Sequence, residues 1–456
     1  MRQTGICRTI VLAAILAIPA HGLAADRYVR PGATGTGSGA DWTNAYPSLP
    51  ATLVRGDTYF LADGSYGSYT FDDANSGTTT ITIIKATGAA HGTDTGWSAA
   101  YGDGQAVFTH WNIYTDYYTF DGVVRNPDWR QGAVSAYGIK VSGDRPVRLD
   151  NAAGTGGDNL TFRYVDFEGG GRDTGSGDDV IYGLTGNSNI TFQYCALHDS
   201  NRTIFLMRGT WRNLLVDHSY LARNTSTPAI HGELLSMTSS DGVVFSHNVI
   251  EDIEGTAIFA GLNGGTAANW KIYGNVVFHS AAYAADIGRV PGHNAGIAGL
   301  VYVANDASNN NRGDNFWVYN NTMYNIRGTY SGVVIQLGSG NIVQNNVWYS
   351  SVRTNNSFSG TLGYNWYYNT TADGDSTSTK VVCSSSCNVF AAAGSKDFSL
   401  SSAIPGGLGL AAPFNVDPNG MVRGGDGTWD RGAFEFSGGT SSAAPAAPNG
   451  LRIISE

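Results

Sequence analysis

The sequence predicts an all-β fold built as a parallel β-solenoid, in which short strands stack coil upon coil. Seven short segments repeat one pattern: an apolar residue, two variable residues, often Asn or a small residue, then apolar residues again. Their first residues are 30, 24, 29, 27, 46 and 25 positions apart, which suits coils with variable loops better than leucine-rich or ankyrin repeats. After residue 25, no window of about eleven residues shows helical periodicity.

These segments form one predicted column of strands, and a second strand rich in Val, Ile and Phe precedes most of them. The first column begins at Phe162, Phe192, Val216, Phe245, Ile272, Val318 and Val343. The second column covers residues 180–184, 203–208, 233–238, 257–262, 300–303 and 333–337. Earlier coils are looser, at residues 57–62, 80–85, 107–114 and 118–124.

Asparagine recurs within the first column, at Asn248, Asn275, Asn321 and Asn346. Asn tolerates the left-handed backbone conformation, and its side chain can hydrogen-bond along a stack of turns. We therefore expect these four residues to form a structural ladder and not to bind a ligand.

Charge and composition narrow the function. The 456-residue chain has 37 acidic against 27 basic residues, only five of them Lys, and a net charge of −10. This balance argues against a protein that tracks nucleic-acid phosphates. A local cluster of Arg could still hold an acidic polymer. The 24 Tyr and 10 Trp residues suit the apolar faces of sugar rings, and they are equally good strand formers.

The N-terminal residues 1–25 have the pattern of a signal peptide, with Arg2 and Arg8 before an apolar run at 9–18. That run is too short to span a bilayer and no later run is long enough. We expect a secreted or periplasmic monomer with a β domain at 26–436 and a Gly/Ser/Ala/Pro-rich tail at 437–456. In an oxidising compartment Cys383 and Cys387 could pair, whereas Cys195 is expected to be buried.

Both ends of the β domain resemble one known group of proteins. The opening at 28–32, followed by Gly39, Trp42 and the stretch 56–66, resembles the N-terminal entry of the pectin-lyase-like superfamily of secreted bacterial proteins. The stretches 416–420 and 429–435, with Arg423 between them, are similar to its C-terminal end. The resemblance implies a single-stranded right-handed parallel β-helix. It specifies fold well and chemistry poorly.

The candidate site comes from aligning the second column on Ile181, Ile204, Leu234 and Ile258. This alignment places Asp178, Asn201, His231 and Gly255 in one column, with Asp179, Arg202, Gly232 and Thr256 beside them. Glu233 shares a strand face with His231. Neighbouring coils lie about 4.8 Å apart, so these charged groups would lie within roughly 15 Å of one another.

That group of residues suits β-elimination from a uronate. His231 is the candidate base, and Arg202 would neutralise the carboxylate that makes the adjacent proton acidic. Asp178, Asp179 and Glu233 could bind Ca²⁺ or substrate. The structural alternative is that the aspartates cap a turn and pair with Arg202 at the surface. In the interval after Ile272, Arg289 and His293 could contact an acidic polymer from a large loop, or could simply be solvated.

Gly232 and Glu233, followed by a strand and Asn248, resemble part of polysaccharide lyase family six. That family's Lys and Arg would fall near Thr238 and 260–263, where this chain has neither. The likeness is therefore partial and does not bring the family's mechanism with it. Two alternatives stay open. One is a glycoside hydrolase that uses the paired carboxylates. The other is a polysaccharide-binding or adhesion protein without catalysis.

Overall fold

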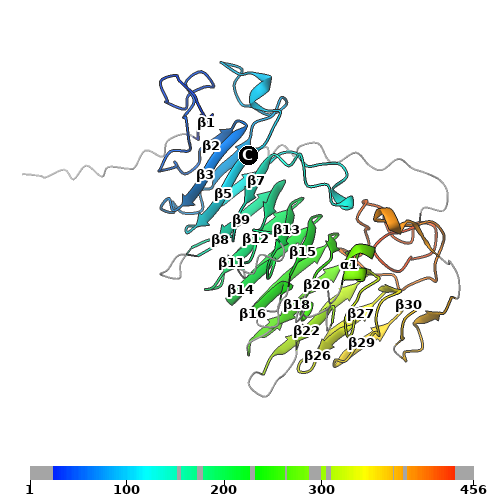
Figure 1. Ribbon diagram of the computed structural model, residues 1–456. Coiled ribbons are helices and arrows are strands. Elements are labelled where there is room, and N and C mark those ends of the chain that lie inside the picture. The colour runs from blue at the N-terminus through cyan, green and yellow to red at the C-terminus, as the bar shows by residue number, and fades with distance from the viewer. Residues whose placement is uncertain are drawn as a thin grey trace, which may run out of the picture.

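The computed structural model is a parallel β-helix in which 31 strands join into one sheet that winds along the molecule (Figure 1). The structure describes residues 24–150, 156–171, 178–225, 232–261, 264–286, 299–303, 310–372, 374–383 and 388–436. The predicted fold class is confirmed. Within that part of the chain, none of the helices has the length and hydropathy needed to cross a membrane.

The coils begin with a smaller N-terminal set of strands. These are β1 (Asp26–Val29), β2 (Thr58–Leu61), β3 (Gly64–Phe71), β4 (Ile81–Lys85), β5 (Ala106–Ile113) and β6 (Tyr118–Asp121). They pair in parallel with one another and then with the strands of the main coils. They therefore start the same solenoid and do not form a separate sheet.

Three columns of strands make up the main coils, and each column is one face of the helix. The first contains β9 (Leu160–Arg163), β12 (Ser188–Gln193), β20 (Lys271–Tyr273), β24 (Trp317–Tyr319), β27 (Asn341–Gln344) and β29 (Gly360–Gly363). The second contains β7 (Ile139–Ser142), β10 (Val165–Glu168), β13 (Ala196–Ser200), β15 (Tyr220–Asn224), β17 (Val249–Glu251), β21 (Val276–Phe278), β25 (Thr322–Tyr324), β28 (Val347–Tyr349), β30 (Trp366–Tyr368) and β31 (Thr379–Val381). The third contains β8 (Val147–Arg148), β11 (Ile181–Gly183), β18 (Ala257–Gly261), β22 (Val301–Val303) and β26 (Val333–Ile335).

Two long strands connect the third face to the first. β14 (Phe205–Asp217) and β16 (Glu233–Ser246) pair with each other, and the register shifts between Met207 and Thr210, where the chain turns the corner. Gly209 in that corner has a φ of +74°, a conformation that glycine adopts without strain. Each of these two strands thus begins on the third face and ends on the first face. β19 (Thr266–Ala268) and β23 (Arg312–Asp314) continue this corner in later coils.

Helix is scarce, as expected, but not absent. α1 (Ala281–Asp286) is a six-residue α-helix, shorter than any window in which periodicity would show. Three 3₁₀ turns lie outside the coils, at η1 (Ala99–Tyr101), η2 (Trp129–Gln131) and η3 (Ala393–Ser395). Near the C-terminal end, β32 (Phe390–Ala392) and β33 (Asp397–Leu400) form a small antiparallel pair.

The core lies inside the coils, and its stacking confirms the predicted register of the first column. Each of the seven predicted first residues pairs with the next, from Phe162 with Phe192 to Val318 with Val343. The rings of Phe120, Phe162 and Phe192 stack with centroids 5.1 and 4.7 Å apart and are fully buried. Burial of such a side chain contributes about 2–3 kcal/mol.

The asparagine ladder is also confirmed and extends one coil further than predicted. Oδ1 of Asn275 accepts the backbone N–H of Asn248 at 2.9 Å, and Asn321 and Asn346 accept in the same way at 3.0 Å. Asn365 continues the series by accepting the N–H of Asn346 at 3.0 Å. These residues are at most 1% exposed, so the ladder satisfies backbone donors that water cannot reach. Of the cysteines, Cys195 is buried and free, Cys383 is disulfide-bonded, and Cys387 lies outside the described residues.

Candidate active site

The third face carries the charged residues that the sequence predicted, but the predicted register is wrong by one residue in one coil. Ile181 pairs with Phe205 and not with Ile204. The predicted alignment of Ile204 with Leu234, and of Leu234 with Ile258, is confirmed. The residues that follow them pair in the same order, Phe205 with Leu235 and Leu235 with Phe259. Each strand here has two consecutive buried apolar residues, so the apolar pattern alone leaves two possible registers.

The shift changes which charged residues share a column. By the observed offsets, Asp179 lies level with Thr203 and Glu233, whereas Asp178 lies level with Arg202. Asp179 and Glu233 are each 1% exposed. The backbone N–H of Asp178 donates to Oδ1 of Asn201. The structure therefore brings Asp178, Asp179, Arg202 and Glu233 to one part of this face.

Asp179 and Arg202 form a two-point ion pair. Nε of Arg202 donates to Oδ1 of Asp179 at 2.8 Å, and Nη2 donates to Oδ2. Burial raises the pKa of Asp179, although Arg202 acts in the opposite direction. Arg202 keeps about a quarter of its side chain exposed, at 23%. The pair thus holds a buried carboxylate directly beneath a partly exposed guanidinium.

Two arginines lie against the ring of Tyr182 on this face, and two more lie on the next coil, an arrangement that the sequence pattern does not predict. The guanidinium of Arg145 lies 4.1 Å from the centre of the Tyr182 ring, and that of Arg148 lies 6.0 Å away. Tyr182 pairs with Leu206 on the next coil, where Arg208 is two residues further along β14 and Arg202 lies just before that strand. Tyr182 was missed because it falls inside a short strand, where an aromatic residue is unremarkable.

Each of these arginines has an acidic neighbour on the same face. Nη2 of Arg145 lies 3.4 Å from Oδ1 of Asp178, and Nε of Arg148 donates to Oδ1 of Asp150 at 3.2 Å. Glu233 and Asp179 act on Arg208, whose pKa is lowered by burial. Nη1 of Arg208 donates to the side chain of Ser236 at 3.2 Å. The side chains of Arg145 and Arg148 remain about one-third exposed, at 33% and 34%.

The structure does not test three of the predicted site residues. His231, Arg289 and His293 lie outside the described residues, so the structure does not place them. Of the predicted calcium ligands, Glu233 lies two coils away from Asp179, and both oxygens of Asp179 are already bound to Arg202. They do not form a ready-made oxygen cage of the kind calcium takes.

Two other groups of potential metal ligands do come together among the described residues. Glu168, His198 and Asp199 lie on the second face, and His198 bridges Asp166 at 2.8 Å and Asp199 at 2.5 Å. Burial lowers the pKa of His198, but hydrogen bonds to the two aspartates outweigh it and raise the value to about 9. His198 is thus a buried, charged group within a network of ion pairs.

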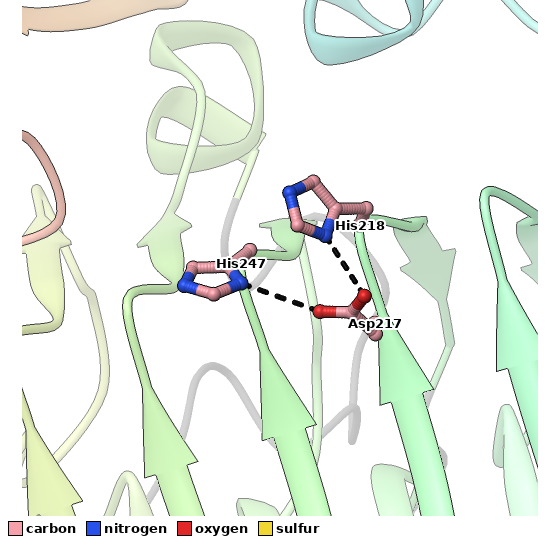
Figure 2. A group of neighbouring side chains, drawn as sticks. All are labelled: Asp217, His218 and His247. Atoms are coloured by element: carbon pink, nitrogen blue, oxygen red, sulfur yellow. Dashed lines mark hydrogen bonds and ion pairs between the residues drawn. The ribbon is translucent and has the colours of Figure 1, made fainter. Parts of the chain in front are cut away.

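The second group contains Asp217, His218 and His247, at the ends of β14 and β16 (Figure 2). The sequence did contain a signal for it. His218 and His247 hold the same position, third, in two successive segments of the first column. That position is the turn residue with positive φ, which Tyr164, Tyr194 and Asn320 occupy in other coils.

Comparisons with known proteins leave the family open. No family model matches the chain, and no curated protein matches it. Among solved structures, three chains match. One of them is the crystal structure of pectate lyase Pel9A, at a TM-score of 0.47 and 16% identity over 91% of this chain and 97% of that one. This is a distant likeness of overall fold, so the functional argument rests on the side chains.

Proposed function

We propose that the protein is a secreted enzyme that cleaves an acidic, uronate-containing polysaccharide by β-elimination. The observation that carries the proposal is the position of Arg145 and Arg148 against the ring of Tyr182 on the outer third face, with Arg202 and Arg208 on the next coil. A planar guanidinium binds a carboxylate through two parallel hydrogen bonds. Arg145 and Arg148 are paired with Asp178 and Asp150 at one carboxylate oxygen each and stay about one-third exposed, so their guanidinium groups can still reach a substrate carboxylate.

The chemistry requires both a base and a cation. The base removes the proton next to the uronate carboxylate, and the electron pair forms a double bond as the glycosidic oxygen leaves. A positive group on the carboxylate stabilises the negative charge that develops there. Arg145 and Arg148, each about one-third exposed, are the cations open to that carboxylate, while Arg202 adds charge and holds Asp179.

We propose His231 as the base, on sequence grounds, because it is two residues before Glu233 at the start of β16. Histidine titrates near neutral pH, which suits proton abstraction. Arg289 and His293 remain proposed contacts for the acidic chain. Tyr182 offers an aromatic surface on which a sugar ring could pack.

Calcium is the alternative source of positive charge. Asp178, Asp179 and Glu233 are its proposed ligands, but Asp179 would first have to exchange Arg202 for the ion. We therefore assign neutralisation of the substrate to arginine. On this assignment, a chelator should leave the activity unchanged.

One observation favours a glycoside hydrolase as the second candidate. Burial raises the pKa of Asp179, as a general acid requires, and the buried Glu233 lies in the same column. Against it, both oxygens of Asp179 are engaged by Arg202. Asp179 could therefore act as a general acid only if Arg202 moves away when the substrate binds.

A panel of alginate, pectate, hyaluronan, chondroitin and bacterial exopolysaccharides separates these functions. Ultraviolet absorbance reports the unsaturated uronate and a reducing-sugar assay reports every cleavage, each with and without a chelator. A lyase raises both signals together. Reducing ends without absorbance would indicate the hydrolase. No cleavage of any polymer, with binding retained, would indicate a binding protein and reject the proposal.

A further inference from the structure

The turns at the ends of β14 and β16 place two histidines one above the other. His218 follows Asp217 directly, and its backbone N–H donates to the carbonyl of Ser246, the residue before His247. Both histidines have left-handed backbones, with φ of 47° and 57°. Their ring centroids are 4.8 Å apart, which is the spacing of neighbouring coils.

Asp217 faces both rings, one with each carboxylate oxygen, as Figure 2 shows. Nδ1 of His218 is 2.9 Å from Oδ2 of Asp217, and Nδ1 of His247 is 3.3 Å from Oδ1. Two imidazole nitrogens and a carboxylate therefore face one point. Their ligand atoms all lie within 4.8 Å of one another.

These separations are close to those around a tetrahedral metal ion. With zinc–ligand bonds of about 2.0–2.1 Å, two ligands lie roughly 3.3 Å apart. The two Asp–His separations, 2.9 and 3.3 Å, are already close to that value. These two separations run to the two different oxygens of Asp217, so side-chain rotation has to bring the three ligand atoms, which lie within 4.8 Å of one another, to a single ion.

The surroundings hold the three side chains in place. Oγ of Ser246 donates to Oδ1 of Asp217 at 2.7 Å. The ring of Tyr273 meets His247 edge-on at 5.2 Å. Partners of this kind orient the ligands of protein metal sites.

We propose that Asp217, His218 and His247 bind one Zn²⁺ ion that joins two neighbouring coils. Two imidazoles with one carboxylate suit zinc, whereas calcium and magnesium take oxygen ligands. Each histidine would bind through Nδ1 and carry its proton on Nε2. The side chain of His218 is 24% exposed, so a water molecule can fill the fourth position. The site lies at the opposite end of β14 from Arg208 and is independent of the proposed lyase activity.

The test uses mature protein stripped with a chelator and then titrated with ZnCl₂, followed by calorimetry and elemental analysis. The variants are His218→Asn and His247→Asn, because Asn occupies the same turn position in other coils as Asn320 and Asn345. The control is His110→Asn, since His110 on β5 contacts Asn112 and no carboxylate among the described residues. Far-ultraviolet circular dichroism checks that each variant folds.

We expect one zinc ion per chain, a higher melting temperature with zinc, and affinity reduced at least about 100-fold in both variants but not in the control. Binding that is absent from the wild-type protein, or equally strong in both variants, would overturn the proposal. A second readout needs no variant. Co²⁺ should give intense visible absorption typical of a tetrahedral site, and the weak spectrum of hydrated cobalt would contradict the assignment.

Discussion

Arg202 binds the buried carboxylate of Asp179 through two parallel hydrogen bonds, one from Nε and one from Nη2. The two residues come from consecutive coils, 23 positions apart in the chain. Asp179 has no exposed side-chain surface, so its charge depends on this partner. Arg202 therefore has two roles: it stabilises the third face by pairing with Asp179, and it is one of the charged groups that would meet a substrate.

Replacing Arg202 should cost more stability than replacing both partners. Arg202→Ala leaves a buried carboxylate unpaired, which we expect to lower the free energy of unfolding by on the order of 3 kcal/mol. Thermal denaturation of Arg202→Ala, and of Arg202→Ala combined with Asp179→Asn, measures the difference. If the double variant melts at or below the temperature of the single variant, the pair is not coupled as described.

Arginine substitutions should affect substrate binding selectively. Arg148→Gln removes a charge beside Tyr182, and we expect KM for the acidic polymer to rise roughly tenfold, with a weaker dependence on salt. The matched control is Arg212→Gln, since Arg212 is exposed on the same strand β14 that carries Arg208. Equal effects of the two substitutions on KM would remove the evidence for a specific cation cluster.

A substitution at the centre of the asparagine ladder should lower the stability of the protein. In Asn275→Ala, the buried N–H of Asn248 and the carbonyl of Phe245 both lose their partner. We expect a loss of about 2–4 kcal/mol, measured by chemical denaturation. Asn213→Gly is the control, because Asn213 also bonds to an asparagine on the next coil but is exposed. A change of similar size there would mean that the buried ladder has no special role.

His198 should make stability depend on pH in the alkaline range. Its folded pKa is raised to about 9 from 6.5, so the stabilisation is complete below about pH 6.5 and is lost as the pH rises through about 9. The expected loss is on the order of 3 kcal/mol. Melting temperatures from pH 6 to pH 10 should fall for the wild-type protein and fall less for His198→Gln. Parallel curves would show that His198 is not the titrating group.

Much of the fold could be predicted from the sequence, because the first column has one apolar residue per coil at a recognisable turn. The register from Phe162 to Val343 follows directly from that pattern. The register of the third face is harder to predict. Val180 and Ile181 are both buried, as are Ile204 and Phe205, so a shift of one residue leaves the apolar pattern unchanged.

The site was only partly predictable for a related reason. Asp179 and Arg202 do not share a column as predicted, but they still form an ion pair, because a long arginine side chain spans a shift of one residue between adjacent coils. Arg145, Arg148 and Tyr182 come together through the winding of the coils, which their sequence positions do not reveal. The stacked pair His218 and His247 could have been found, since both occupy the same place in the aligned segments.

The central claim is that the arginine-rich third face supports elimination, and mass spectrometry of the products tests it most directly. Digestion of the polymer that gives the strongest signal should yield new non-reducing ends lighter by one water molecule than hydrolysis products. Arg148→Gln should slow their formation and Arg212→Gln should not. Products that carry the full added water molecule would contradict the account and establish a hydrolase instead.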